Sequence, residues 1–299
     1  MGAWGTGLYS GDFASDLRIA VAAVARLPFD GERLLGLLCD TEPSAALDPK
    51  DPDHTAFWLV CADQFAKRGI VCSSVLEAAL AIIDQDRDLA TMSSLGMNET
   101  GLRARRRMLA DLRQRLVAST PSSKPRTVLK EPQPYLLETG DVIVFPTARG
   151  HCLNPYFQTK EAITGGWRQD GWGAALIVER GRAFDFLTWY RPLRAPEATV
   201  AKPDLAELVV RADWTLQRPG TLSRSHFKRM EIEVLGSLSI DAAKLNQLFP
   251  KRPAGITDAI ADISIANRLS LPAGGGGPVV NRQPTRALQT LRRLADIQV

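Results

Sequence analysis

The stretch MGAWGTGLYSGDFASDL, residues 1–17, decides how the first part of the chain folds. Glycine stands at positions 2, 5, 7 and 11, where it lets the backbone adopt conformations that are closed to residues with a side chain. The segment has neither a helical nor a strand period, and a helical pattern begins at Asp12. We therefore expect an ordered clasp in which Trp4 and Tyr9 cover the helices that follow.

Glycine-rich segments also occur in nucleotide-binding loops, but the patterns here do not match one. Gly5-Thr6-Gly7 lacks the preceding strand that a dinucleotide fingerprint requires. The glycines at 274–277 lack the lysine of a P-loop. We expect no cofactor.

Apolar residues at helical spacing continue from the clasp to about residue 117. They predict helices over 12–27, 32–39, 54–67, a segment starting at Ser74, and 100–117. Ser74 and Glu77 have the spacing of a capping box, which predicts that they begin the fourth helix. Asp84, Asp86 and Asp88 are spaced like the start of a calcium loop. Because Leu89 and Leu95 occupy the positions of the required glycine and glutamate, calcium is rejected.

The last of these helices is rich in arginine. Leu102, Leu109, Leu112 and Leu116 mark its apolar side, and its arginines at 103–115 include Arg103, Arg105, Arg106 and Arg107. A basic helix face could bind nucleic-acid phosphates. The alternative is a solvated face whose arginine stems cover apolar neighbours, which is the more common role of charged helix residues.

The pattern changes after residue 118. Residues 119–134 are rich in proline and basic residues, which is typical of a semi-extended linker. Beyond them, 142–145, 173–179, 183–190 and 230–235 have the β-branched or alternating composition of strands, with a turn expected at Arg180-Gly181-Arg182. We predict an α+β protein with a helical domain at 1–118, a linker at 119–134, and a mainly antiparallel β domain with flanking helices at 135–299.

Composition limits the possible functions. The 299-residue chain has a formal net charge of +4, which permits an acidic partner. It has no long apolar run or secretory signal pattern, so we expect a cytoplasmic protein without a membrane partner. The four cysteines lack CxxC spacing and the three histidines are dispersed, so we expect buried thiols and no metal site.

Three segments resemble a known family. They are MGAWGTGLYSGDFASDLR (1–18), AFWLVCADQFAKRG (56–69) and LEAALAIIDQDRDL (76–89). In this order and spacing they are similar to the DUF4259-type bacterial proteins, which open with MGxWGxGxFxxDxAxD. The resemblance covers about residues 1–117 and implies a compact helical domain with the glycine-rich start packed on it. It implies no catalytic residues. Tyr9 and Leu17 depart from the family's usual phenylalanine and tryptophan.

A shorter resemblance lies in the second domain. LETGDVIVFP (137–146) is similar to the start of the Imm26-like β domains of predicted bacterial toxin-immunity proteins. This resemblance is confined to about residues 136–190. It implies a twisted antiparallel sheet or partial barrel that could bind a partner, and no residue role is carried over from it.

The same region is dense in the residue types that dominate protein interfaces. The candidates for binding a protein partner are Trp167, Arg168, Trp172, Trp189 and Arg191. The competing interpretation is that Trp172 and Trp189 fill the core.

No catalytic motif stands out. Ser223, Ser225 and His226, or His151 with Cys152, bring a nucleophile near a base in sequence only. The leading hypothesis is therefore a non-enzymatic bacterial binding protein, such as an immunity-type or defence-associated factor that neutralises a protein partner. The alternatives are a nucleic-acid-associated protein using 103–115, and a hydrolase with an unrecognised site.

Overall fold

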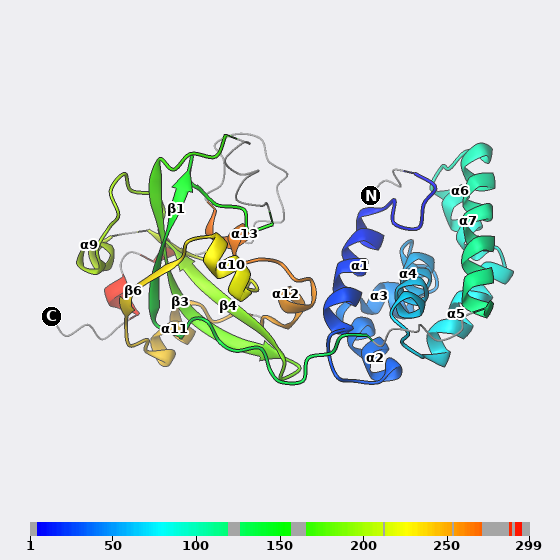
Figure 1. The fold of residues 1–299 in the computed structure, drawn as a ribbon, viewed down its shortest axis with the longest axis horizontal. Helices are drawn as coiled ribbons and strands as arrows, with labels where there is room; N and C mark the ends of the chain where they lie inside the picture. Colours follow the sequence, from blue (N-terminus) through cyan, green and yellow to red (C-terminus); the bar gives the residue numbers. More distant parts are fainter. Residues whose placement is uncertain are drawn as a thin grey trace. The chain divides into compact units, whose positions relative to one another are not determined.

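The computed structural model describes residues 5–118, 126–156, 166–211, 213–252, 254–270, 287–288 and 291–294. The chain divides into two compact units, Met1–Glu131 and Pro132–Val299 (Figure 1). Helices make up the first unit, and an antiparallel sheet with helices makes up the second. The predicted α+β class is confirmed.

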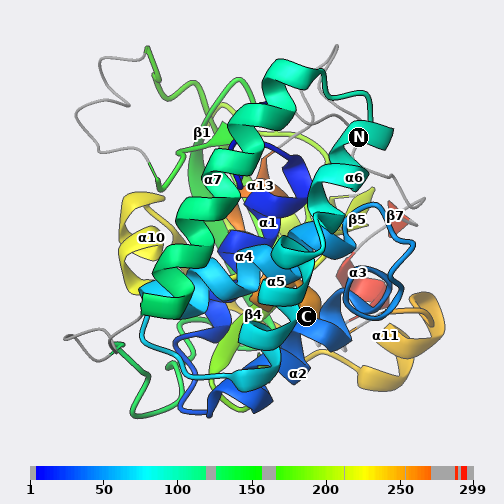
Figure 2. The same cartoon turned by 90° about the vertical axis from the view of Figure 1, so that its right-hand side faces the viewer.

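The helical unit is built around one apolar helix. Its elements are α1 (Asp12–Val24), α2 (Gly31–Thr41), α3 (Pro43–Leu47), α4 (His54–Lys67), α5 (Ser73–Asp84), α6 (Arg87–Ser94) and α7 (Glu99–Ala118). Helix α4 contacts α1, α3, α5, α6 and α7, and Figures 1 and 2 show it enclosed among them. Most residues of α4 are buried, including Phe57, Val60 and Phe65. The other helices therefore pack around α4.

The predicted capping box is wrong. Helix α5 begins at Ser73 after Cys72, so Ser74 lies inside its first turn and caps nothing. The carboxylate of Glu32 on α2 instead accepts the backbone N–H of Ser74 at 3.3 Å and its hydroxyl at 2.8 Å. A tertiary acceptor satisfies the helix terminus in place of a local one.

The predicted linker is attached at both of its described ends. Residues 119–125 lie outside the described residues. The Arg126 side chain donates to the backbone carbonyl oxygens of Ala25 and Phe29. The backbone N–H of Leu129 donates to the backbone carbonyl oxygen of Arg26 at 2.7 Å. Gln133 belongs to the other unit, where its backbone N–H donates to the backbone carbonyl oxygen of Phe186 at 2.9 Å.

The β unit contains β1 (Asp141–Ala148), β2 (His151–Cys152), β3 (Gly171–Ala183), β4 (Leu187–Arg194), β5 (Trp214–Leu216), β6 (Glu233–Ser237) and β7 (Ala287–Leu288). The strand order is β2-β1-β3-β4-β5-β7, with β6 also paired to β1, and each pairing is antiparallel. The predicted turn at 180–182 is wrong, because these residues lie inside β3. Phe184 and Asp185, both at positive φ, form the turn instead.

Helices cover both faces of this sheet. They are α9 (Leu205–Val210), α10 (Arg224–Arg229), α11 (Ala242–Leu248), α12 (Ile256–Ile260), α13 (Ala266–Leu269) and the 3₁₀ turn η1 (Leu291–Arg293). Val142 and Val144 face a core with Leu208, Trp214 and Leu245. Ile143 and Phe145 face a second core with Tyr190 and Ile265. Strand alternation thus divides β1 between the two cores.

No helix in the described part of the chain is both long enough and apolar enough to cross a lipid bilayer.

Two glycines of α2 provide a matched test of packing. A methyl group at Gly31 would lie 2.0 Å from the Val71 carbonyl oxygen, whereas one at Gly36 meets nothing within 4 Å. We expect Gly31→Ala to destabilise the protein by about 1–3 kcal/mol. We expect Gly36→Ala to stabilise it by up to about 1 kcal/mol, because alanine favours helix. Urea unfolding measures both variants, and a harmless Gly31→Ala would contradict the close approach.

Candidate functional site

The arginines of α7 face a series of carboxylates. Arg113 pairs with Asp84 at 2.7 Å, Arg106 with Asp86 at 3.5 Å and Arg105 with Asp88 at 2.8 Å. Near the end of the helix, Arg115 pairs with Asp63 at 2.8 Å. The aspartate run that resembles a calcium loop therefore supplies counter-charges to the arginine helix.

Arg105 differs from the other arginines because it is buried. Its side chain is 4% exposed and that of Asp88 is 0% exposed. Nε donates to one carboxylate oxygen of Asp88 at 2.8 Å and Nη2 to the other at 3.0 Å, which is the bidentate geometry. Nη1 donates to the carbonyl oxygen of Gly7 at 2.6 Å. One guanidinium thus joins α7, α6 and the glycine-rich segment.

These contacts change the nucleic-acid candidates. Arg105 is enclosed and cannot contact a phosphate backbone. Arg103, Arg106 and Arg107 are exposed. Arg106 already has a carboxylate partner, and Nε of Arg103 donates to the Glu99 carbonyl at 3.4 Å. The structure does not present the four predicted residues as one open basic surface.

Asp63 makes the second attachment of the clasp. The hydroxyl of Tyr9 donates to its carboxylate, and Lys67 approaches it to 2.7 Å. Burial by itself would raise the pKa of Asp63, but the hydrogen bonds from Lys67, Tyr9 and Arg115 outweigh it and hold the pKa below its usual value. Tyr9 therefore covers α4 as predicted, while Trp4 lies outside the described residues.

The sequence interpretation missed Asp63 and Asp88 as the clasp's partners. The available signal was an aspartate in the middle of a helix too apolar to be exposed, since Asp63 lies between Val60 and Phe65. A buried carboxylate at such a position requires a cation or several donors.

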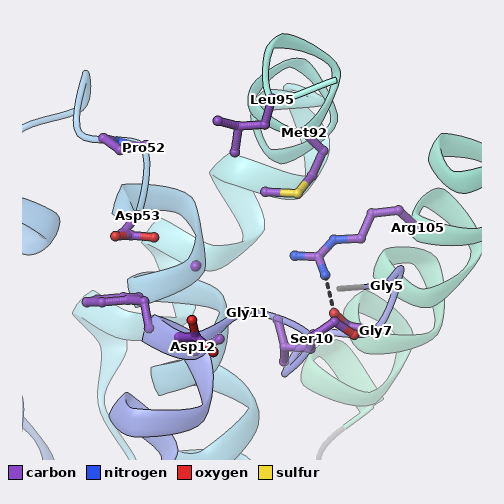
Figure 3. A pocket seen from close by; sticks show the side chains of 14 residues that line it. Gly5, Gly7, Ser10, Gly11, Asp12, Pro52, Asp53, Met92, Leu95 and Arg105 are labelled. Carbon is purple, nitrogen blue, oxygen red and sulfur yellow. Dashed lines mark hydrogen bonds between the residues drawn. The ribbon is translucent and has the colours of Figure 1, made fainter. Parts of the chain in front are cut away.

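A small cavity lies behind the clasp. Figure 3 shows Gly5, Ser10, Gly11 and Asp12 on the clasp side, opposite residues from α6, α7 and the loop before α4. Its volume is about 70 Å³, whereas sites for drug-sized ligands and cofactors have about 300–1,000 Å³. Room of this size suits water molecules. The Gly7 carbonyl that accepts from Arg105 further shows that this part of the segment presents an acceptor, and phosphate binding requires donors.

Two predicted partner residues in the β unit are buried, so they are unsuited to the surface role predicted for them. Trp189 lies between two glycines: a methyl group at Gly181 or Gly255 would come within 2.4 or 2.3 Å of its ring. Arg191 is buried and pairs with Glu179 at 2.6 Å. Trp189 fills the interior, in agreement with the competing interpretation.

The other three predicted partner residues lie nearer the surface. Arg168 is exposed, and Trp167 and Trp172 are half-buried. Trp172 packs at the edge of one core, and the ammonium of Lys202 lies 5.2 Å from its ring centre. Lys202 in turn pairs with Glu233. The segment 167–172, which includes the first two residues of β3, therefore presents aromatic and cationic groups near the surface.

The catalytic candidates are not assembled. The hydroxyl of Ser223 accepts the backbone N–H of His226 at 3.1 Å, so it caps α10. The His226 ring packs against Tyr156 with centroids 4.8 Å apart, and burial lowers its pKa. His151 and Cys152 are successive residues of β2, so their side chains point to opposite faces. The contacts described for Ser223 with His226, and for His151 with Cys152, therefore do not form a nucleophile and base.

Within the described ranges, no group of three or more His, Cys, Asp or Glu side chains is placed to hold a metal ion.

Comparison with protein-family models, curated proteins and solved structures finds no match to this chain, so both family resemblances stay predictions.

The buried and exposed arginine pairs of α7 allow a controlled test. We expect Arg105→Ala to cost about 3–5 kcal/mol, because it leaves Asp88 charged and enclosed. Arg113→Ala removes a pair whose side chains are 47% and 48% exposed, and we expect little change. Chemical denaturation of both variants checks this, and similar losses would show that burial of Arg105 does not matter.

Asp63 should make stability fall in acid. Its pKa is lower in the folded than in the unfolded chain, so its contribution is complete above the unfolded pKa and is lost as the pH falls through the folded pKa. We expect Asp63→Asn to be less stable than wild type at about pH 6, with a gap that narrows below about pH 4. Urea titrations across this range measure the gap, with exposed Asp40→Asn as control. A gap independent of pH would refute the assignment.

Proposed function

We propose that this is a non-enzymatic binding protein whose β unit recognises a protein partner, as an immunity-type or defence-associated factor would. The observation that carries the proposal is the surface segment with Arg168 exposed and Trp167 and Trp172 half-buried. Tryptophan and arginine are the residue types most enriched among residues that dominate binding energy.

The distribution of charge supports the same unit. Residues 132–299 contain 21 lysines and arginines against 16 aspartates and glutamates, a formal net charge of +5. Residues 1–131 contain 16 against 17, a net charge of −1. The basic excess of the chain therefore belongs to the β unit, despite the arginine helix. This excess favours an acidic partner through electrostatic steering.

The nucleic-acid alternative receives less support. Most arginines of α7 pair with carboxylates, as described above, and Arg103 and Arg107 are left as exposed arginines without a carboxylate partner among the described residues. Phosphate binding scales with the number of phosphates neutralised, so two arginines would contribute little.

The hydrolase alternative also lacks an observation in its favour. The Ser223 hydroxyl and the His226 ring serve as a helix cap and a packing surface in the described contacts. Hydrolysis by this pair would require the ring to face a hydroxyl within hydrogen-bond reach.

The proposal is tested by affinity capture from the native host, followed by titration of the captured protein. We expect the variant Trp167→Ala with Arg168→Ala to bind at least about 30-fold more weakly, as loss of a central contact does. Arg103→Ala with Arg107→Ala and the exposed Arg224→Ala serve as controls and should bind like wild type. Recovery of no stable partner, or equal weakening by a control, would overturn the proposal.

A further inference from the structure

Four arginines from four segments of the β unit converge beside α12. Arg191 on β4 and Arg252, which precedes α12, both bind Glu179 of β3, at 2.6 and 2.8 Å. Asp258 of α12 forms ion pairs with Arg268 of α13 at 2.9 Å and with Arg218, which follows β5, at 3.4 Å. Helix α12 contacts both β3, which carries Glu179, and β4, which carries Arg191. We call this set the α12 arginine cluster.

The cluster contains more positive than negative charge. In the described part of the chain, Glu179 and Asp258 are the carboxylates that pair with its four guanidinium groups, which leaves a formal excess of two positive charges. Asp258 is 3% exposed, and Arg191 and Arg268 are largely enclosed. Excess charge in such surroundings is costly unless something compensates it.

Electrostatics show that the like charges affect one another. Burial lowers the pKa of Arg191, and nearby Arg252 lowers it further although Glu179 and Asp258 act in the opposite direction. Burial likewise lowers the pKa of Arg268, with Asp258 opposing and Arg218 adding to the effect. The ion pairs around Glu179 and those around Asp258 are therefore close enough to influence one another.

The four arginines do not have the same role. Arg252 uses its donors internally, on Glu179, on Asn246 at 2.6 Å and on the Leu245 carbonyl at 2.9 Å, so it anchors α11. Arg268 donates from Nε to the Pro219 carbonyl at 3.0 Å. Arg218 has the longest ion pair of the cluster and is 58% exposed. It forms the edge of the cluster that solvent reaches.

We propose that this edge, formed by Arg218 with Arg268 behind it, binds an oxyanion of the phosphate type, either free or as a phosphate ester. At this edge two guanidinium groups share the one carboxylate of Asp258, which leaves a formal excess of one positive charge there. The planar guanidinium fork presents paired N–H donors that suit phosphate oxygens. This site does not depend on the partner proposed above, because it uses neither Trp167 nor Arg168.

The test is a binding titration of the full chain with a phosphate compound, monitored by ³¹P NMR. Inorganic phosphate probes the free ion and phenyl phosphate probes an ester, both at constant ionic strength maintained with chloride. We expect saturable broadening or shift of the phosphorus signal for at least one of them, and the one that binds more tightly identifies the source of the phosphate. Arg218→Gln should weaken binding at least about tenfold, because it removes a charged hydrogen-bond donor.

The control is Arg224→Gln, which removes an exposed arginine of α10 and should leave the titration unchanged. Thermal unfolding with and without phosphate separates binding from stability, because the increment caused by phosphate should shrink in Arg218→Gln whatever its own melting temperature. Absence of saturable binding to wild type, or equal weakening by both variants, would overturn the site.

Discussion

The helical unit depends on one buried ion pair, Arg105 with Asp88. A guanidinium enclosed among helices is stable only if its donors are satisfied, and here the Asp88 carboxylate and the Gly7 carbonyl satisfy them. The pair therefore fixes three segments that lie far apart in the sequence. The hydroxyl of Tyr9 fixes the clasp a second time, on Asp63. Gly5, Gly7 and Gly11 do not adopt the positive φ values that require glycine, so these two polar contacts, and not a special glycine conformation, hold the clasp in place.

The sequence predicted the parts of this arrangement but not how they connect. Helical periodicity revealed the helices, and the composition of residues 1–17 revealed the clasp, because both are local properties. That Arg105 is buried while Arg103 and Arg106 are exposed depends on which side of α7 meets α6, and this contact lies outside any local pattern. Ser74 shows the same limit. Its spacing to Glu77 fits a local cap, but Glu32 from another helix supplies the acceptor.

In the β unit, residue type was a poor guide to location. Trp189 and Arg191 resemble interface residues in the sequence, yet both are buried. The informative residues were the glycines: Gly181 and Gly255 leave room for the indole ring between them. A pairing of distant glycines with one tryptophan cannot be recognised before the strands are in register. The hairpin turn was misplaced for a related reason, since the strand continues through Arg180-Gly181-Arg182, where Gly181 is a packing position.

Arginine has opposite consequences in the two units, and counter-charge explains the difference. On α7, Arg105, Arg106, Arg113 and Arg115 each pair with an aspartate. The helical unit as a whole has a net charge of −1. Around α12, four arginines share two carboxylates, and the unit that contains them has a net charge of +5. A balanced network can be explained by stability alone. An unbalanced network with one edge open to solvent is paid for in folding free energy, so a bound anion gives a physical reason for its presence. On the proposals made above, ligand recognition belongs to the β unit, whereas the described ion pairs of α7 join helices of the first unit.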